Sequence, residues 1–272
     1  MGLYWISLVS TGVPADARAY WQAANTASPY GLVPGQTGAY VYSPVFLYLV
    51  RPLTAFGAAP FYALWRLIEL AATAAMAGPL LPLVMLVNGV PNELNAANIQ
   101  VLLALVIVVG FRYPAAWSFV LLTKVTPGIG LLWFAVRREW RSLGVALAAT
   151  ALVSAPFFVL APGLWIGWFG VLAESARGPS PHGLIDVPLL VRLPVAAVII
   201  AWGARGDHRW TVPIASMLAL PVVWITSLSM LVAVLALARP IRPLAGPTSA
   251  LGSGDAGQRP IALPAALQGA QR

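Results

Sequence analysis

Long apolar runs separated by short polar interruptions cover most of the chain. Within these runs the apolar residues are continuous, whereas membrane β-strands alternate apolar and polar residues with a period of two. A helix needs about 20 apolar residues to cross a bilayer. Residues 142–160 form one uninterrupted run close to that length. The pattern therefore predicts an α-helical membrane protein.

Most of the other runs contain a helix-breaking or charged residue. The predicted apolar segments are residues 44–56, 61–87, 99–111, 114–136, 142–160, 187–203 and 212–238. The main interruptions are Pro79, Pro82, Lys124, Pro127 and Pro221. We expect an all-α, polytopic fold with roughly eight to ten membrane segments, several of them broken or re-entrant. Irregular backbone at membrane depth must be covered by protein or water, so the breaks also predict a cavity inside the membrane.

The polar stretches suggest how the chain is organised. Residues 1–238 are expected to form one membrane-embedded domain, with 16–43 as a first outer loop and 161–186 as a second. The tail at 239–272 is rich in Pro, Gly, Ala and Ser, which predicts a disordered cytoplasmic segment. Residues 3–13 are apolar but too few to span a bilayer. We expect them to be the end of a first span whose beginning is missing.

Composition supports this interpretation and excludes several classes of protein. Only 9% of residues are charged and the mean hydropathy is +0.82, whereas a soluble protein has about 25% charged residues. The net charge is +8, but the arginines punctuate the apolar runs instead of forming a nucleic-acid patch. This spacing is typical of cytoplasmic loops under the positive-inside rule. We expect a multi-pass protein of the cell membrane, in contact with membrane lipids and not with nucleic acid.

Asp16 is the first candidate for chemistry, because it is an acid in a chain with few charges. As a general base at the outer membrane face, it would take the proton of an acceptor hydroxyl. The alternative is an ordinary interfacial acid or a helix N-cap. The residues alone leave both interpretations open.

Two cations are candidate ligands for phosphate. Lys124 lies in an apolar segment, where it either extends to the interface or meets an anion such as a lipid phosphate. Arg18 is two residues after Asp16 and could pair with that acid, bind phosphate or anchor the interface.

Other polar and aromatic residues could line a site. Tyr20, Tyr40 and Tyr42 would stack on sugar rings or form part of an aromatic belt. Asn98 and Gln100 open the 99–111 segment; capping is the stronger expectation for Asn98. The chain has no phosphate-cradling Gly motif, so an activated donor would be carried by a lipid. No cofactor is expected, and with two His and no Cys no metal site is expected, while a divalent ion held by carboxylates stays open as the alternative.

Several blocks of sequence resemble glycosyltransferase family 87. The blocks are Asp16-x-x-x-Tyr20, Pro29-Tyr30, Tyr40-x-Tyr42-Ser43-Pro44-x-Phe46, Asn98-Ile99-Gln100, Lys124-x-x-Pro127, Arg137-Arg138-Glu139-Trp140-Arg141 and Leu220-Pro221-Val222-Val223-Trp224. Together they cover about residues 14–238.

The resemblance implies a C-type membrane glycosyltransferase. Such an enzyme would move a sugar, most simply mannose, from a polyprenyl-phosphate donor to a lipid or glycan acceptor outside the cytoplasm. By this resemblance Asp16 is the base of an inverting displacement. Lys124 matches the membrane Lys of the family. We expect Lys124, with Arg18, to bind the donor phosphate, and we expect Tyr20, Tyr40, Tyr42 and Gln100 to line the substrate site.

The chain also departs from the family pattern. The first span is short, the chain is shorter than its relatives, and Ile225-Thr226-Ser227-Leu228 stands where relatives often have His. Two other functions therefore remain open: a transporter or lipid flippase, which would also use broken helices and a buried Lys, and an inactive truncated relative.

Overall fold

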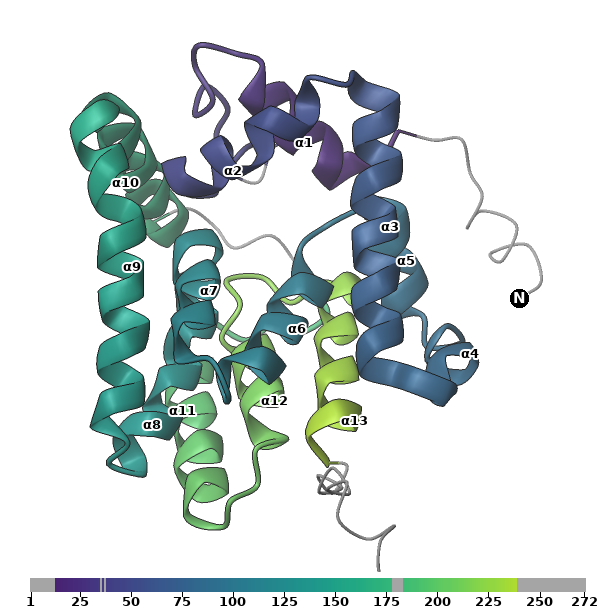
Figure 1. Ribbon diagram of the computed structural model, residues 1–272, viewed down its shortest axis with the longest axis vertical. Coiled ribbons are helices and arrows are strands. Elements are labelled where there is room, and N and C mark those ends of the chain that lie inside the picture. The colour runs from purple at the N-terminus through teal and green to yellow at the C-terminus, as the bar shows by residue number, and fades with distance from the viewer. Residues whose placement is uncertain (1–12, 35, 37, 178–182, 239–272) are drawn as a thin grey trace, which may run out of the picture. The chain divides into compact units, whose positions relative to one another are not determined.

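The computed structural model describes residues 13–34, 36, 38–177 and 183–238, and these residues are helical with no strand. The α-helices are α1 (Ala15–Ala24), α2 (Pro44–Thr54), α3 (Ala58–Ala77), α4 (Leu81–Val84), α5 (Gly89–Ala96), α6 (Gln100–Gly110), α7 (Trp117–Thr123), α8 (Leu132–Val136), α9 (Trp140–Leu160), α10 (Pro162–Arg177), α11 (Leu189–Arg205), α12 (Thr211–Leu218) and α13 (Val232–Ala238) (Figure 1). The 3-10 helices are η2 (Gly78–Leu80), η3 (Pro114–Ala116), η4 (Thr126–Leu131) and η5 (Ile225–Leu231). The predicted all-α class is confirmed for the described residues.

The number of membrane segments differs from the expectation. Within the described part of the chain, two helices are long and apolar enough to cross a membrane, Ala58–Val84 and Trp140–Leu160. A third span results if α5 and α6, which meet at 110°, count as one. The eight to ten expected segments are not confirmed among the described residues. Several apolar runs instead form helices of about half a span, such as 114–123 and 126–136.

The predicted helix breaks are confirmed at three places. The chain leaves α3 at Gly78, whose φ of 57° favours glycine, and Pro79 and Pro82 follow in the short helices η2 and α4. The 114–136 run breaks at Lys124, which has extended backbone between α7 and η4. The last run breaks between α12 and η5, at the segment that contains Pro221.

Two segments read as polar connections contain helices. The expected loop at 16–43 begins with α1, and the polar stretch before Asn98 contains α5. Alanine is the best helix former, so the five alanines of α1 favour a helix at this position. Their small side chains also allow the helix to pack closely against its neighbours. Residues 3–12 of the expected first span, and the expected tail at 239–272, lie outside the described residues.

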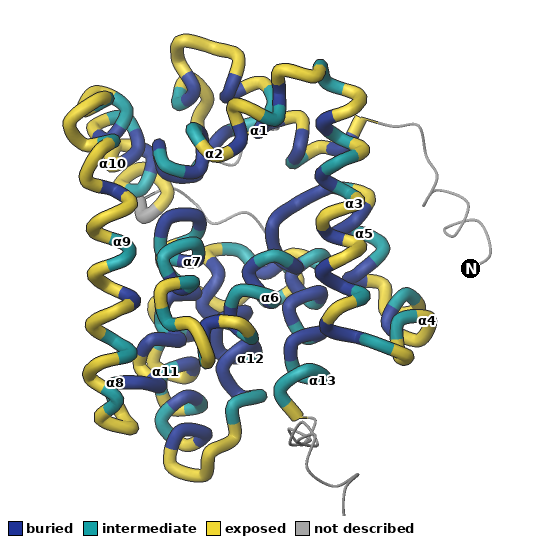
Figure 2. Tube along the Cα trace, in the orientation of Figure 1, coloured by how far each residue is buried: buried dark blue, intermediate teal, exposed yellow. Residues whose placement is uncertain are grey.

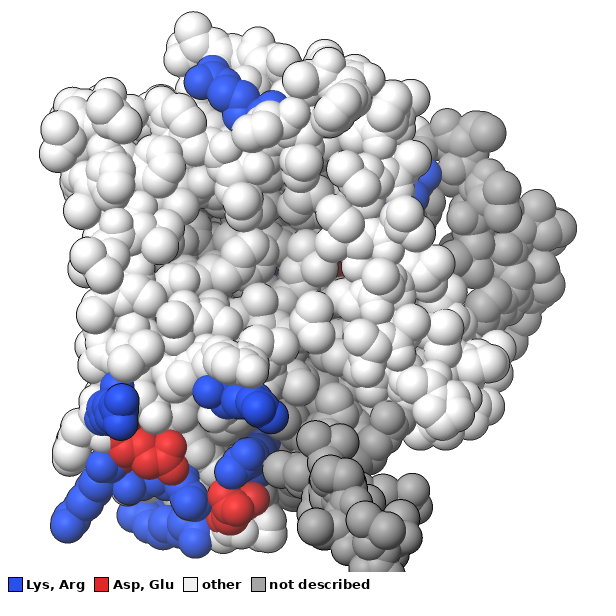
Figure 3. All heavy atoms as spheres, in the orientation of Figure 1, with Lys and Arg blue, Asp and Glu red and all other residues white. Residues whose placement is uncertain are grey.

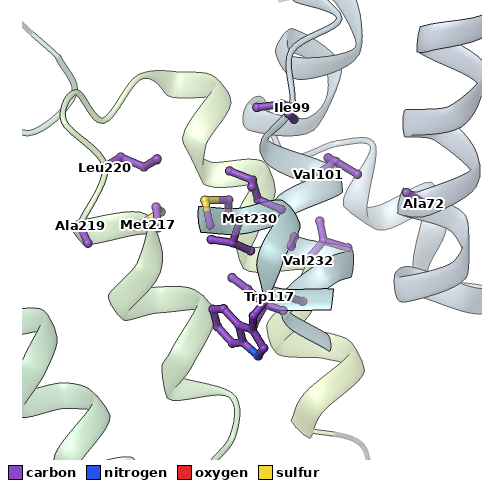
Figure 4. Packing of buried hydrophobic residues seen from close by; sticks show 14 of the residues in the cluster. Ala72, Ile99, Val101, Trp117, Met217, Ala219, Leu220, Met230 and Val232 are labelled. Carbon is purple, nitrogen blue, oxygen red and sulfur yellow. The ribbon is translucent and has the colours of Figure 1, made fainter. Parts of the chain in front are cut away.

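The core lies where the short helices cross (Figure 2). Trp117 of α7 is fully buried beside Met230 and Val232, with Val101 of α6 and Ala72 of α3 in the same cluster (Figure 4). Side-chain atoms added at Gly110 or Gly130 would collide with the Trp117 indole. These glycines therefore let α6 and η4 approach the largest side chain of the core.

Apolar side chains cover much of the exterior. Leu152 on α9 is 74% exposed and Val198 on α11 is 67% exposed. In the view of Figure 3 the charged side chains gather mainly at the lower end and leave a broad uncharged band above. Water does not favour so much exposed apolar surface, whereas lipid does. The exterior is therefore typical of a membrane protein.

Arg192 of α11 holds the breakpoint between α12 and η5. Its side chain is only 6% exposed, and its nitrogens donate hydrogen bonds to the carbonyl oxygens of Val187, Leu218, Leu220 and Pro221 at 2.7–2.8 Å. The carbonyls at the end of a helix have no partner within it, so a side-chain donor has to supply one. A single guanidinium thus satisfies the irregular backbone at this break.

We predict that Arg192→Met lowers the free energy of unfolding by about 3 kcal/mol or more, because several buried carbonyls lose their donor. Thermal unfolding in detergent micelles measures the effect. Arg205→Met removes an exposed arginine from the same helix and serves as the control. Equal stability of the two variants would show that Arg192 is not a structural cross-link.

Candidate active site

Helix α1 positions Asp16 and Tyr20 on one face. The two residues are four apart, so their side chains lie one above the other. Asp16 is in the first turn, where the partial positive charge of a helix N-terminus favours an anion. Ala17 and Ala23 are buried against the core, which fixes the rotation of the helix.

Tyr20 reaches a small cluster of polar groups in the interior. Its hydroxyl lies 3.1 Å from the Tyr42 hydroxyl and donates to Oδ1 of Asn98 at 3.1 Å. The rings of Tyr20 and Tyr42 meet edge to face, with centroids 5.2 Å apart. Burial raises the pKa of both tyrosines, so both hydroxyls remain protonated hydrogen-bond donors at neutral pH.

Lys124 enters this cluster from the break after α7. Its Nζ lies 5.9 Å from the centroid of the Tyr42 ring, and its charge interacts with Asp16 and Glu93. The buried Ser43 hydroxyl donates to the Leu122 carbonyl, which ties the segment carrying Tyr42 to the end of α7. The two residues expected to act as base and phosphate ligand therefore lie close enough for their charges to interact, although they are far apart in the sequence.

The environment of Asp16 opposes its ionisation. Burial raises the pKa of its carboxyl above the usual 3.8, and the positive charge of Lys124 partly offsets this effect. A base whose pKa is raised toward the working pH binds a proton more readily than an exposed aspartate does. Perturbed carboxyls of this kind are concentrated at functional sites, but they also occur in structural networks.

Glu93 and Asn98 organise the break between α5 and α6. The Glu93 Oε1 accepts hydrogen bonds from the backbone N–H groups of Gln100 and Val101, the first two residues of α6. Asn98 was expected to cap α6, and its Oδ1 instead accepts from Ile99 N–H, before the helix starts. The expectation that Asn98 caps α6 is therefore wrong, and the side chain of Glu93 from the preceding helix provides the cap.

Two further residues of this cluster are not among those predicted from the sequence. Glu69 of α3 is fully buried, and neither carboxyl oxygen has a hydrogen-bond partner among the described residues. It interacts electrostatically with Asp16 and Glu93. One turn earlier, Trp65 donates to the Asn98 carbonyl at 2.9 Å and packs edge to face on Tyr20. The sequence does contain a signal for Glu69, which is an acid within the apolar 61–87 run, because ionisable residues in membrane spans are usually functional.

The remaining predicted residues lie in different surroundings. Arg18 is exposed, and residues two apart on a helix do not share a face, so the structure does not bring it to Asp16. Tyr40 is buried, but its hydroxyl donates to the Ser43 carbonyl at 3.2 Å. Gln100 is fully buried, and its side-chain nitrogen faces the Ser227 hydroxyl at 3.5 Å.

Two hollows open near this cluster. One of about 630 Å³ is lined by Ala27, Ser28, Pro29, Tyr30, Gly31, Ala161, Gly163 and Leu164. The second, of about 540 Å³, is lined by Ala24, Asn25, Thr26, Ala27, Arg51, Thr54 and Ala55. Asp16 and Lys124 line neither hollow. The described residues contain no group of three or more His, Asp or Glu arranged to hold a metal ion.

The sequence pattern that defines glycosyltransferase family 87 matches residues 40–253, which is most of the chain. The chain belongs to glycosyltransferase family 87. The resemblance in the sequence blocks is thus confirmed, and membership implies glycosyltransferase activity with a donor and an acceptor. The matched range includes Tyr40, Tyr42, Gln100 and Lys124, while Asp16 lies before it. No curated protein and no solved structure matches the chain significantly.

We predict that Asp16→Asn stabilises this family 87 protein near neutral pH. The pKa of the Asp16 carboxyl is 3.8 in the unfolded chain and higher in the folded protein. The free energy of unfolding therefore falls as the pH rises from the unfolded pKa through the folded pKa, and it stays lower at every higher pH. Asparagine does not ionise, so the variant avoids this loss.

Thermal unfolding of both proteins across the acid range measures the difference. The stabilisation should shrink as the pH falls toward 3.8 and should vanish below it. A variant less stable than the wild type at neutral pH would show that ionised Asp16 is favourable in the fold. Glu174→Asn, at an exposed position on α10, is the matched control.

Proposed function

We propose that this protein transfers a sugar, mannose by preference, from a polyprenyl-phosphate donor to a hydroxyl of a lipid or glycan acceptor. The proposal places the reaction at the outer face of the cell membrane. Its main support is the electrostatic interaction between Asp16 and Lys124, with Lys124 beside the ring of the buried Tyr42. Family membership supplies the reaction class, glycosyl transfer.

The two charged residues supply complementary parts of a single displacement. Asp16 takes the proton of the acceptor hydroxyl as the acceptor oxygen attacks the anomeric carbon of the sugar. The bond from that carbon to the phosphate oxygen breaks, and the polyprenyl phosphate leaves with the bonding electrons. Lys124 stabilises the charge that develops on the phosphate. Attack opposite the leaving group inverts the anomeric configuration.

The position of Lys124 suits a lipid-borne phosphate. The residue lies at a break between two short apolar helices, 114–123 and 126–136, where a polyprenyl chain would find apolar surface and its phosphate a cation. Lys124 is half-buried as a residue, so the attraction of its charge to phosphate is screened less than it would be on the surface.

The tyrosines and the broken helix hold the reacting groups in place. Tyr20 and Tyr42 offer protonated hydroxyls and ring faces, which suit a sugar that both hydrogen-bonds and stacks. Tyr40 and Gln100 support the site indirectly: the Tyr40 hydroxyl donates to the Ser43 carbonyl, and the Gln100 side chain donates to the Ser227 hydroxyl. We leave Arg18 out of the donor site, because it faces away from Asp16.

We predict that Asp16→Asn reduces transfer by about 10²–10⁴-fold, the usual contribution of a general base. Membranes that carry the variant are assayed with radiolabelled polyprenyl-phosphate mannose. The wild-type rate should fall as the pH drops through the raised pKa of Asp16, at a pH above 3.8. Undiminished transfer by the variant rules out Asp16 as the base. Glu174→Gln controls for the loss of an exposed acid on α10.

The role of Lys124 in binding phosphate is tested with one variant that removes the positive charge and one that keeps it. We predict that Lys124→Gln weakens transfer by about 10–100-fold, since a hydrogen bond to a charged group contributes about 1.5–3 kcal/mol. Lys124→Arg keeps the charge and should retain more activity. The loss should appear in the donor KM and in kcat, with the acceptor KM little changed. Equal activity of the Gln and Arg variants would show that Lys124 does not bind the donor phosphate.

A further inference from the structure

Positively charged side chains cluster at the lower end of the view in Figure 3, which is the end opposite to α1 in Figure 1. We define the basic end as Arg112, Arg137, Arg138, Arg141, Arg205 and Arg209. They come from the turn after α6, from the turn between α8 and α9 with the start of α9, and from the end of α11 with the turn that follows it. Segments far apart in the sequence thus bring six guanidinium groups to one surface.

Two turns of the basic end are cross-linked. Arg137 donates to Glu139 at 2.7 Å and to the Ala204 carbonyl at 3.0 Å, and it pairs with Asp207 at 3.2 Å. Arg138 and Asp207 have left-handed backbone, with φ of 58° and 55°, which non-glycine residues adopt only at a cost. These contacts hold both turns in fixed shapes.

The charges of this end are not balanced within the described residues. Glu139 and Asp207 pair with Arg137 and Arg209. The exposed side chains of Arg112, Arg138, Arg141 and Arg205 form no ion pair there. The surface therefore presents an excess of positive charge to an external anion.

The surroundings of the basic end are those of a membrane boundary. Trp140 is 61% exposed and Trp202 is 55% exposed, and both lie on the helices that carry the arginines. Further along these helices the exposed residues are apolar, such as Leu147 and Val198. Exposed indoles between apolar and basic surface are typical of the headgroup region of a bilayer.

We propose that the basic end is a binding surface for anionic phospholipid headgroups. The excess arginines contact the phosphates, and Trp140 and Trp202 lie at the level of the glycerol backbone. A soluble anion would satisfy the arginines but would leave the exposed indoles without an apolar partner. The proposal does not depend on the transferase reaction, because it concerns the opposite end of the molecule.

The test is co-purification of lipid with the full chain. The protein is equilibrated in mixed micelles of phosphatidylcholine and phosphatidylglycerol, and native mass spectrometry counts the lipids retained. We expect the wild type to prefer phosphatidylglycerol. Arg138→Asn with Arg141→Gln should reduce this preference by about thirty-fold, as expected for two basic residues near an anionic surface. Asparagine is chosen at 138 because it tolerates left-handed backbone.

The control removes two arginines from the other end, by Arg18→Gln with Arg51→Gln, and should keep the preference. Equal preference in the wild type and the Arg138/Arg141 variant overturns the proposal, as does a similar loss in the control. In a final competition experiment, glycerol phosphate is added to the protein with bound phosphatidylglycerol. If it displaces the lipid at equal concentration, the surface binds phosphate alone and the proposal is wrong.

Discussion

The break between α5 and α6 is the constraint on which the site depends. Two helices that meet at 110° in an apolar environment expose the first N–H groups of the second helix. Lipid offers these groups no partner, so the protein has to supply one. Glu93 does so with one carboxyl oxygen, and Asn98 occupies the gap between the helices. Because Asn98 also accepts from Tyr20 and Trp65, the break fixes α1 and α3 as well.

The same arrangement explains why the site is electrostatically costly. Asp16 and Glu93 interact with one cation, Lys124, and Glu69 interacts with both of these acids. Burial disfavours every charge that lacks a partner. An arrangement selected for stability alone would replace such groups with apolar side chains. Their presence in a chain with only 9% charged residues is easier to explain if the charges act on a substrate. The Arg192 cross-link shows the contrasting case, a buried charge whose donors are used on backbone carbonyls.

The sequence predicts the helical class and most of the breaks, because proline and glycine act locally. It does not predict how many apolar runs cross the membrane, since run length does not reveal that 114–136 folds into two short helices. Composition also hides α1, whose alanines carry little hydrophobic signal. Asp16 and Lys124 can be selected as candidates from the rarity of charge. Their proximity, the capping by Glu93 and the burial of Glu69 depend on tertiary packing.

The most direct test of this account is whether residues 16 and 124 lie together in the membrane. The chain contains no cysteine, so Asp16→Cys with Lys124→Cys introduces a unique thiol pair. The account predicts that a short bifunctional thiol reagent cross-links this pair within one molecule. The pair Asp16→Cys with Arg209→Cys, whose second position is in the basic end, should not be cross-linked. Failure of the first pair to cross-link while both thiols react singly would contradict the shared site.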